Sequence, residues 1–234
     1  MNKIFLPGLL LLLLSACGGS DKASIFGGHL GYHNGQELPL AKIDGKQPLN
    51  QVQFDGAKHD FIVKDMTNDK GILRHQEKYR GRTIVREALP GLEYTRVGMM
   101  VVDNSQARDY QSRLIYQGIK PDELPSSGTA HYKGTAVVMS TQQASNADEM
   151  NMDVDFGNKT VKGRLNNRIR YGTGTNEELN GMDFAGSVNG NRFEATSQST
   201  QFHGGFYGPR GQEFGGVLQD SVRKIDGYYG GHKQ

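Results

Sequence analysis

The chain has 234 residues and an almost balanced charge, with 27 lysine and arginine residues against 25 aspartate and glutamate residues. A net charge of only +2 argues against a role that depends on bulk attraction to nucleic acid. A single cysteine leaves no partner for a disulfide, a redox pair or a thiolate metal site, while 32 glycines and no tryptophan favour many short strands joined by tight turns.

The first residues follow the pattern of a secretory signal peptide. Lys3 precedes an apolar run from Ile4 to Leu14, and two small residues come next. This run has about 11 residues, whereas a helix needs about 20 to cross a bilayer. We therefore predict that residues 1–16 are a signal peptide and not a retained membrane span.

A cysteine directly follows these small residues and completes the pattern Leu-Ser-Ala-Cys. We predict that Cys17 carries a lipid and becomes the mature amino terminus, because such a thiol receives a diacylglycerol before cleavage. Residues 17–24 are small and polar, which suits a flexible tether between the anchor and the fold. Gly18 after the cysteine resembles the outer-membrane sorting pattern, so we expect a lipid-anchored outer-membrane protein, palmitoylated and displayed on the cell surface.

Residues 25–123 are expected to form a variable, β-rich amino-terminal domain. The runs with strand-like composition are 60–63, 83–87, 94–102 and 113–116, and turn-forming residues separate several of them. Residues 119–128 contain two prolines and several small residues, so we interpret this segment as the linker to a second domain.

Residues 124–234 have a more regular pattern. Met150, Met152, Val154 and Phe156 alternate with polar residues, which predicts a half-buried strand. An Asn-Gly pair at 189–190 lies between two alternating runs, and this pair is the strongest short signal of a hairpin. Repeated hairpins over about 110 residues predict an antiparallel barrel, because closure removes exposed sheet edges. The expected class is therefore all-β.

Two segments resemble a known family. Residues 124–135, Leu-Pro-Ser-Ser-Gly-Thr-Ala-His-Tyr-Lys-Gly-Thr, resemble the entry to the carboxyl-terminal barrel of the transferrin-binding-protein-B-like surface lipoproteins. Residues 206–216 resemble the late barrel motif of that family, although Gly211 stands where alanine is more frequent. We interpret this motif as structural, and its residues are Phe206, Tyr207, Gly208, Pro209, Glu213, Gly215 and Gly216.

The resemblance implies an eight-stranded carboxyl-terminal barrel behind a variable handle domain. The family includes factor H-binding protein, hemophilin-type haem carriers and complement-binding lipoproteins of Pasteurellaceae. Its members reach the cell surface, often through a dedicated outer-membrane translocon, and this implies the same route for the present chain. The motif itself specifies the barrel and not its ligand.

A group of basic residues in the amino-terminal domain is a candidate binding face. Their same-parity spacing would align them on one side of a strand if the segment were continuously extended, and an aligned basic face suits an acidic partner. The alternative is an ordinary solvated strand face. The residues are Arg74, Lys78, Arg80, Arg82 and Arg86.

Other chemistry has weaker support in the sequence. Asp153 and Asp155 share a strand face that we interpret as solvated, and no catalytic motif is present, so we predict no enzyme. The seven histidines have no metal-ligand spacing, so we also predict no metal site. A haem carrier needs His, Tyr or Met ligands beside an apolar slot. The residues considered for that alternative are His59, His75, Tyr79, Met99 and Met100.

The leading functional hypothesis is a surface lipoprotein that binds a host serum protein, most plausibly a complement regulator, and thereby supports virulence through complement evasion. The alternative is nutrient acquisition by capture of haem or of an iron-carrying host protein. A purely structural envelope lipoprotein is the third interpretation.

Overall fold

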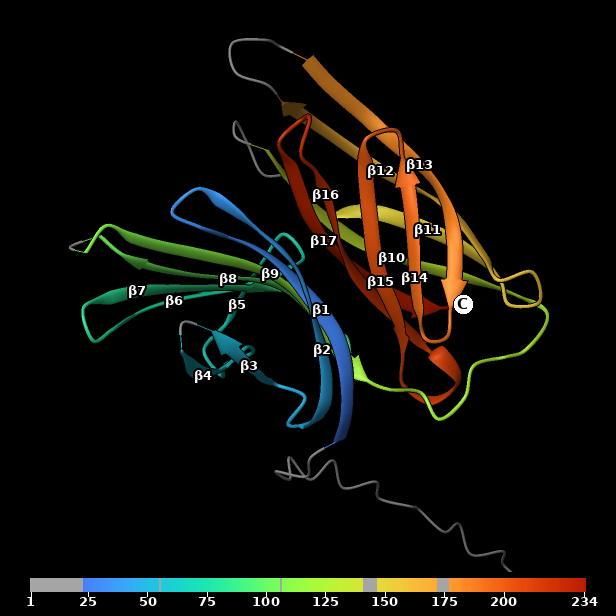
Figure 1. The fold of residues 1–234 in the computed structure, drawn as a ribbon, viewed down its shortest axis with the longest axis horizontal. Helices are drawn as coiled ribbons and strands as arrows, with labels where there is room; N and C mark the ends of the chain where they lie inside the picture. Colours follow the sequence, from blue (N-terminus) through green and yellow to red (C-terminus); the bar gives the residue numbers. More distant parts are fainter. Residues whose placement is uncertain (1–22, 55, 106, 141–146, 172–176) are drawn as a thin grey trace, which may run out of the picture.

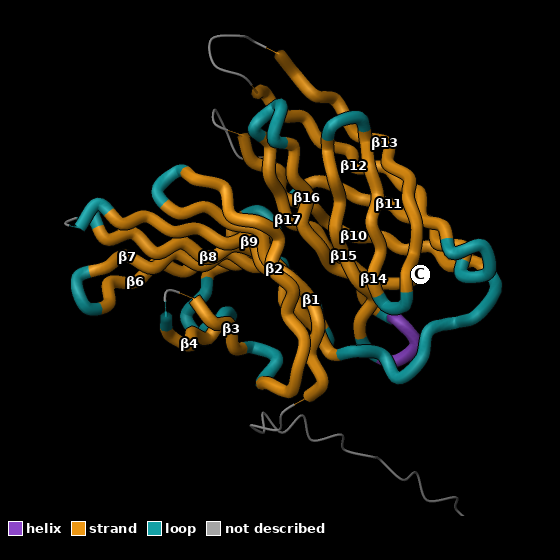
Figure 2. Tube along the Cα trace, viewed as in Figure 1, coloured by secondary structure: helices purple, strands orange, loops and turns teal. Residues whose placement is uncertain are grey.

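The structure is a computed structural model that describes residues 23–54, 56–105, 107–140, 147–171 and 177–234. These residues form seventeen strands and one short 3₁₀ helix, arranged as a seven-stranded sheet, a closed eight-stranded barrel and a two-stranded hairpin (Figures 1 and 2). The prediction of an all-β protein with a carboxyl-terminal barrel is confirmed. Within these ranges no helix has the length and apolar character needed to cross a membrane.

The seven-stranded sheet forms the amino-terminal domain, which we call the handle. Its strand order is β2-β1-β9-β8-β7-β6-β5, and neighbouring strands are antiparallel. The strands are β1 (Ala23–His33), β2 (Gln36–Gln47), β5 (Thr67–Asp69), β6 (Ile72–Tyr79), β7 (Arg82–Ala88), β8 (Thr95–Asn104) and β9 (Asp109–Ile119). A separate hairpin consists of β3 (Gln51–Phe54) and β4 (Ala57–Asp60).

The barrel runs from β10 to β17 in chain order and closes where β17 pairs with β10. Inward residues such as Met152, Val154 and Phe184 alternate with exposed polar residues, because successive side chains of a strand point to opposite faces. The elements are β10 (Thr129–Ser140), β11 (Asp148–Asp155), β12 (Thr160–Tyr171), β13 (Glu177–Asn189), β14 (Arg192–Ser197), β15 (Thr200–Tyr207), η1 (Pro209–Gly211), β16 (Glu213–Asp220) and β17 (Ile225–Lys233).

The handle sheet lies between the barrel and the β3–β4 hairpin (Figure 1). One face packs on the outside of the barrel, where Phe26 and Tyr116 meet Tyr207 and Tyr228 in one apolar cluster. The opposite face packs on the hairpin through a second cluster that includes Phe54. The handle is therefore buried on both faces over part of its area, and its hairpin ends remain uncovered.

Among the strands that the sequence analysis did not predict, β1 and β15 are rich in glycine. In β1, a side chain at Gly27 would place its Cβ 2.0 Å from the backbone oxygen of Tyr116, so close strand packing requires glycine there. β15 contains a Gly-Gly pair at 204–205. These glycines remove the alternation of apolar and polar side chains that reveals a strand.

Two predicted boundaries are wrong. The strand expected at 60–63 ends at Asp60, since the β3–β4 hairpin turns back and Phe61 begins the next loop. The tether expected to run through Ser24 overlaps β1 by two residues, because the backbone oxygen of Ser24 accepts a hydrogen bond from the amide of Lys120 at 2.9 Å. The signal peptide, Cys17 and the rest of the tether lie outside the described residues.

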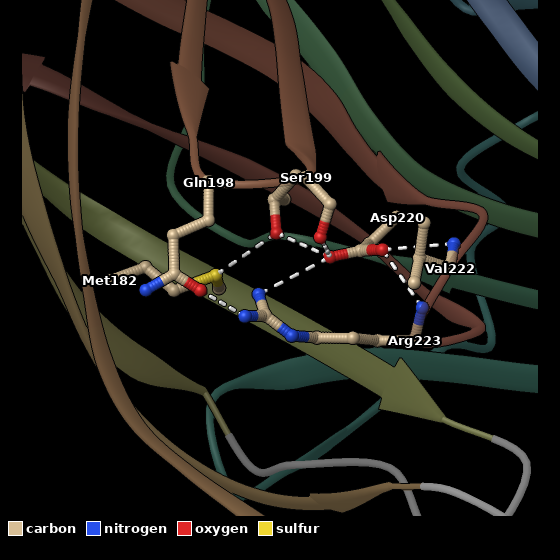
Figure 3. Close-up of polar contacts among 7 residues, drawn as sticks. Met182, Gln198, Ser199, Asp220, Val222 and Arg223 are labelled. Carbon is tan, nitrogen blue, oxygen red and sulfur yellow. Dashed lines mark hydrogen bonds and ion pairs between the residues drawn. The ribbon is translucent and has the colours of Figure 1, made fainter.

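A buried carboxylate links two turns at one end of the barrel. Asp220 is 1% exposed and accepts hydrogen bonds from the hydroxyls of Ser199 and Thr200 and from the amides of Val222 and Arg223 (Figure 3). Burial raises the pKa of this carboxyl. These hydrogen bonds and the Arg223 cation lower the pKa by more than burial raises it, so the pKa lies below its ordinary value. The group joins the β14–β15 turn to the β16–β17 turn.

Candidate functional site: the free end of the handle

The basic residues of the handle do not form one face. The segment turns at Arg80, where φ is 50°, and runs back as β7, so β6 and β7 are a hairpin and not one extended strand. Arg74 and Lys78 point to one face of the sheet, whereas Arg82 and Arg86 belong to the other face. The expectation of a continuous basic strand face is therefore wrong.

Arg74 and Arg86 form ion pairs within the handle. Arg74 contacts Asp69 at 2.6 Å and Glu87 at 3.0 Å. Arg86 is only 4% exposed and contacts Glu77 at 2.7 Å. A buried guanidinium of this kind serves the fold, because removing its partner would leave an uncompensated buried charge. Arg74 and Arg86 are therefore held by the handle itself.

Arg80 and Arg82 line a pocket of about 310 Å³ at the end of the β6–β7 hairpin. The Tyr79 ring beside it is 50% exposed, and the Arg80 guanidinium lies 5.1 Å from the centre of that ring, a cation–π distance. The full lining, which we call the handle pocket, is Ala57, His59, Tyr79, Arg80, Arg82, Ile84 and Val102.

His59 of β4 brings a titratable ring to this pocket. Its ring packs edge-on against Phe54 with 6.3 Å between centres, and its buried Nε2 has no hydrogen-bond partner. Burial and the nearby Arg86 cation lower the pKa of His59. The imidazole is therefore biased toward its neutral form.

A second exposed aromatic side chain lies at the neighbouring hairpin. Tyr110, at the start of β9, is 45% exposed, and its backbone amide donates to Asn34 Oδ1 at 2.8 Å. A 2.9 Å contact between His33 and Asp109 joins the same two hairpins, β1–β2 and β8–β9. The β6–β7 and β8–β9 hairpins end on the side of the handle away from the barrel (Figure 1). Sequence reasoning missed Tyr110, because no sequence signal says which turns lie together.

The residues considered as haem ligands do not converge. His59 and Tyr79 line the handle pocket, whereas His75 lies 4.0 Å from Glu77. Met100 is buried in the cluster under the β3–β4 hairpin, and Met99 packs on the cluster at the opposite face. Within the described residues, no group of three His, Cys, Asp or Glu side chains is placed to hold a metal ion.

The barrel motif lies at the junction between the two domains. The Tyr207 ring packs against Phe26 of β1 with 4.6 Å between centres. Gly208 has φ of 69°, and a Cβ there would lie 2.5 Å from the Tyr94 ring, so the handle loop approaches the barrel backbone closely. Gly215 likewise faces Val97 of β8.

Glu213 is the polar anchor of this junction. It is buried and accepts hydrogen bonds from the amides of Glu93 and Tyr94, at 2.7 and 3.0 Å. From the other side of the seam, Arg192 of β14 donates to the backbone oxygen of Gly27 at 2.8 Å. Glu213 of the barrel motif therefore binds a loop of the handle that lies more than a hundred residues earlier in the chain.

The barrel sequence has recognisable relatives. Residues 124–233 match a family described as the C-lobe and N-lobe beta barrels of Tf-binding protein B. This chain is similar to transferrin-binding protein B. One such protein, from Neisseria meningitidis serogroup B, is 31% identical in an alignment 98 residues long, which covers 33% of this chain and 16% of the relative. The chain spans less than a third of the length of the curated relatives that it matches.

Solved structures share both parts of the fold. Intact Ap-TbpB, which has N and C lobes, aligns with a TM-score of 0.64 and 21% identity over 90% of this chain and 46% of that chain. A crystal structure of a surface lipoprotein aligns with a TM-score of 0.52 and 14% identity, over 91% of this chain and 99% of that chain. The handle and the barrel together therefore form a known type of lobe.

Proposed function

We propose that this chain is a lipid-anchored surface receptor that binds an iron-carrying host serum protein of the transferrin type. The observation that carries the proposal is the likeness of its barrel sequence to transferrin-binding protein B, together with a lobe fold that covers 90% of the chain. This role requires recognition of a protein surface and no catalytic group.

The likeness favours the iron-carrying partner over the complement regulator that the sequence first suggested. The relatives that support the proposal are proteins named for transferrin binding. No contact in the described residues points to a complement regulator. That partner, and haem itself, are alternative outcomes of the experiment below.

We place the host-protein interface at the free end of the handle. Tyr79 and Tyr110 are exposed there beside Arg80, and tyrosine and arginine are the residue types most enriched at binding hot spots. Most of the junction with the barrel is buried, so it is not open to a partner. A stable contact needs about 1,200–2,000 Å² of buried surface, so neighbouring residues of the handle are expected to contribute.

The test is a pull-down from host serum with the mature lipidated chain held in detergent micelles, followed by mass spectrometry of the retained proteins. We expect an iron-carrying serum protein to be retained. Retention of a complement regulator without an iron protein would reject the proposal. A saturable Soret band at one haem per chain would instead establish direct haem capture.

Substitution at the handle end tests the place of the interface. We expect Tyr79→Ala and Tyr110→Ala each to weaken binding of the retained protein by about 1–2 kcal/mol, since each removes exposed aromatic contact area. The matched control is Arg164→Gln on the outer face of β12, whose cation pairs with Asp183 at 2.8 Å. Equal loss in the control, or no loss in both tyrosine variants, would place the interface elsewhere.

Anchoring and display are parts of the same proposal. A receptor for a serum protein must face the outside of the cell, so we expect export through an outer-membrane translocon and attachment by Cys17. Protease added to intact cells should remove the protein. Complete protection until the outer membrane is opened would place the chain in the periplasm and would exclude serum-protein capture.

A further inference from the structure

The handle pocket has an apolar floor between the sheet and the β3–β4 hairpin. Ile84 of β7 and Val102 of β8 pair with each other in the sheet, are only 2% and 3% exposed, and both line the pocket. Ala57 of β4 adds a methyl group from the hairpin. The three strands therefore enclose a concave space whose base consists of hydrocarbon groups.

Planar groups surround this apolar floor. The Tyr79 ring is 50% exposed, and the His59 ring also lines the pocket. The Arg80 guanidinium lies 5.1 Å from the centre of the Tyr79 ring. Such groups attract a further aromatic ring, because aromatic pairs gain energy from offset or edge-on contact and a guanidinium is attracted to the face of a ring. Arg82 already interacts within the chain, so we assign no ligand-binding role to its charge.

We propose that the handle pocket binds one aromatic side chain, phenylalanine or tyrosine, on the surface of the partner protein. The inference rests on the proposed function for the identity of the partner. The pocket volume of about 310 Å³ is at the lower end of the range of about 300–1,000 Å³ that ligand pockets span, so it suits one side chain and not a larger ligand. An aromatic anchor in a desolvated pocket is a frequent hot spot of protein interfaces.

The position and the lining of the pocket favour an aromatic visitor over other side chains. The pocket opens within the proposed interface, because Tyr79 and Arg80 belong to both. An aliphatic side chain would fill the apolar floor but would not use the ring contacts of the rim. A carboxylate would lose its hydration against the buried Ile84 and Val102, which offer it no hydrogen bond.

The first experiment uses N-acetyl-phenylalanine amide as the probe and follows the methyl groups of Ile84 and Val102 by NMR in the full mature chain. We expect saturable binding with about millimolar affinity, and the ring current of the probe should shift both methyl signals. N-acetyl-leucine amide should bind about tenfold more weakly, because it lacks the ring contacts. Equal affinity for the leucine probe, tighter binding of N-acetyl-glutamate amide, or unshifted methyl signals would overturn the proposal.

A variant that fills the pocket tests its place without changing any charge. Ala57 is exposed, so Ala57→Phe should melt at the same temperature as the wild type while its own ring occupies the pocket and weakens probe binding about tenfold. The matched control is Gln53→Phe, which should bind the probe normally. Gln53 pairs with Lys58, next to the Phe54–Ala57 pair, so its side chain points to the opposite face of the same hairpin. Probe binding that is equal in the wild type and in Ala57→Phe would assign the probe to another site and overturn the proposal.

The two proposals fail in different ways. If a host iron protein binds the wild type, Ala57→Phe and Gln53→Phe equally well, the pocket is not part of that interface and the aromatic inference is wrong. If the probe binds in the pocket but no iron protein is retained from serum, the pocket stands and the proposed function is wrong. Loss of the iron protein in Ala57→Phe, with normal retention in Gln53→Phe, would support both.

Discussion

At the residue scale, the seam between handle and barrel contains a carboxyl group that is poised to titrate. Asp226 of β17 accepts a 2.7 Å hydrogen bond from the Tyr32 hydroxyl of β1. Burial raises the pKa of Asp226 to about 6, although the Tyr32 hydrogen bond and the Lys224 cation lower it in part, and the neighbouring Glu37 and Asp220 carboxylates raise it. The group is therefore ionised at neutral pH, although its buried surroundings disfavour the charged form.

This carboxyl should make the folded chain less stable as the pH rises. Its pKa is raised on folding, so its contribution is fully present below about pH 4 and is lost as the pH rises through about 6. We expect the free energy of unfolding of Asp226→Asn to exceed that of the wild type above pH 7 by at most about 3 kcal/mol, with the difference vanishing near pH 4. Thermal melts across this range are the measurement, and Asp183→Asn, in an exposed pair, is the control.

At the scale of elements, the handle sheet depends on positions where two backbones touch. Gly98 of β8 has φ of 158°, and a Cβ there would lie 1.9 Å from the backbone oxygen of Glu87. The neighbouring strand β7 carries both Arg82 of the handle pocket and the buried Arg86. The site therefore relies on a strand contact that only glycine permits.

Gly98→Ala should separate β7 from β8 and destabilise the chain by about 1–3 kcal/mol, the usual cost of overpacking a filled interior. Hydrogen exchange should show earlier opening of β7 than of the barrel strands. Gly157→Ala provides the comparison, because its Cβ would meet nothing closer than 3.4 Å. A stable Gly98→Ala chain with unchanged exchange in β7 would show that the sheet adapts to the added methyl group.

At the scale of the whole molecule, we expect a lipid on Cys17 to attach this lobe to a membrane. Replacing Cys17 by alanine should abolish the incorporation of radioactive fatty acid, because no other cysteine can take its place. The control is a Ser20→Ala chain, which keeps the lipobox and should incorporate normal amounts of label. Label that persists in Cys17→Ala would reject the lipoprotein assignment.

The whole molecule also explains why the handle has little freedom against the barrel. The junction combines the packing of Phe26 on Tyr207 with the bonds that Glu213 and Arg192 make across it. Buried polar groups that are fully paired fix one arrangement, since displacement leaves them without partners. The handle is therefore held in one orientation on the barrel.

The sequence alone determined most strands of the barrel and its resemblance to a known type of lobe. The alternation around Met152 and the Asn-Gly turn at 189–190 predict hairpins, since side-chain direction and turn geometry are local properties. The motif around Tyr207 and Glu213 indicated the resemblance to the family, because close packing at the junction between handle and barrel demands particular residues. Only the tertiary structure decided which basic residues lie near one another. The turn at Arg80 reverses the chain and sends Arg82 to the face opposite Arg74, and His59 reaches the same pocket from another hairpin, because strand pairing between distant segments leaves no mark in local spacing.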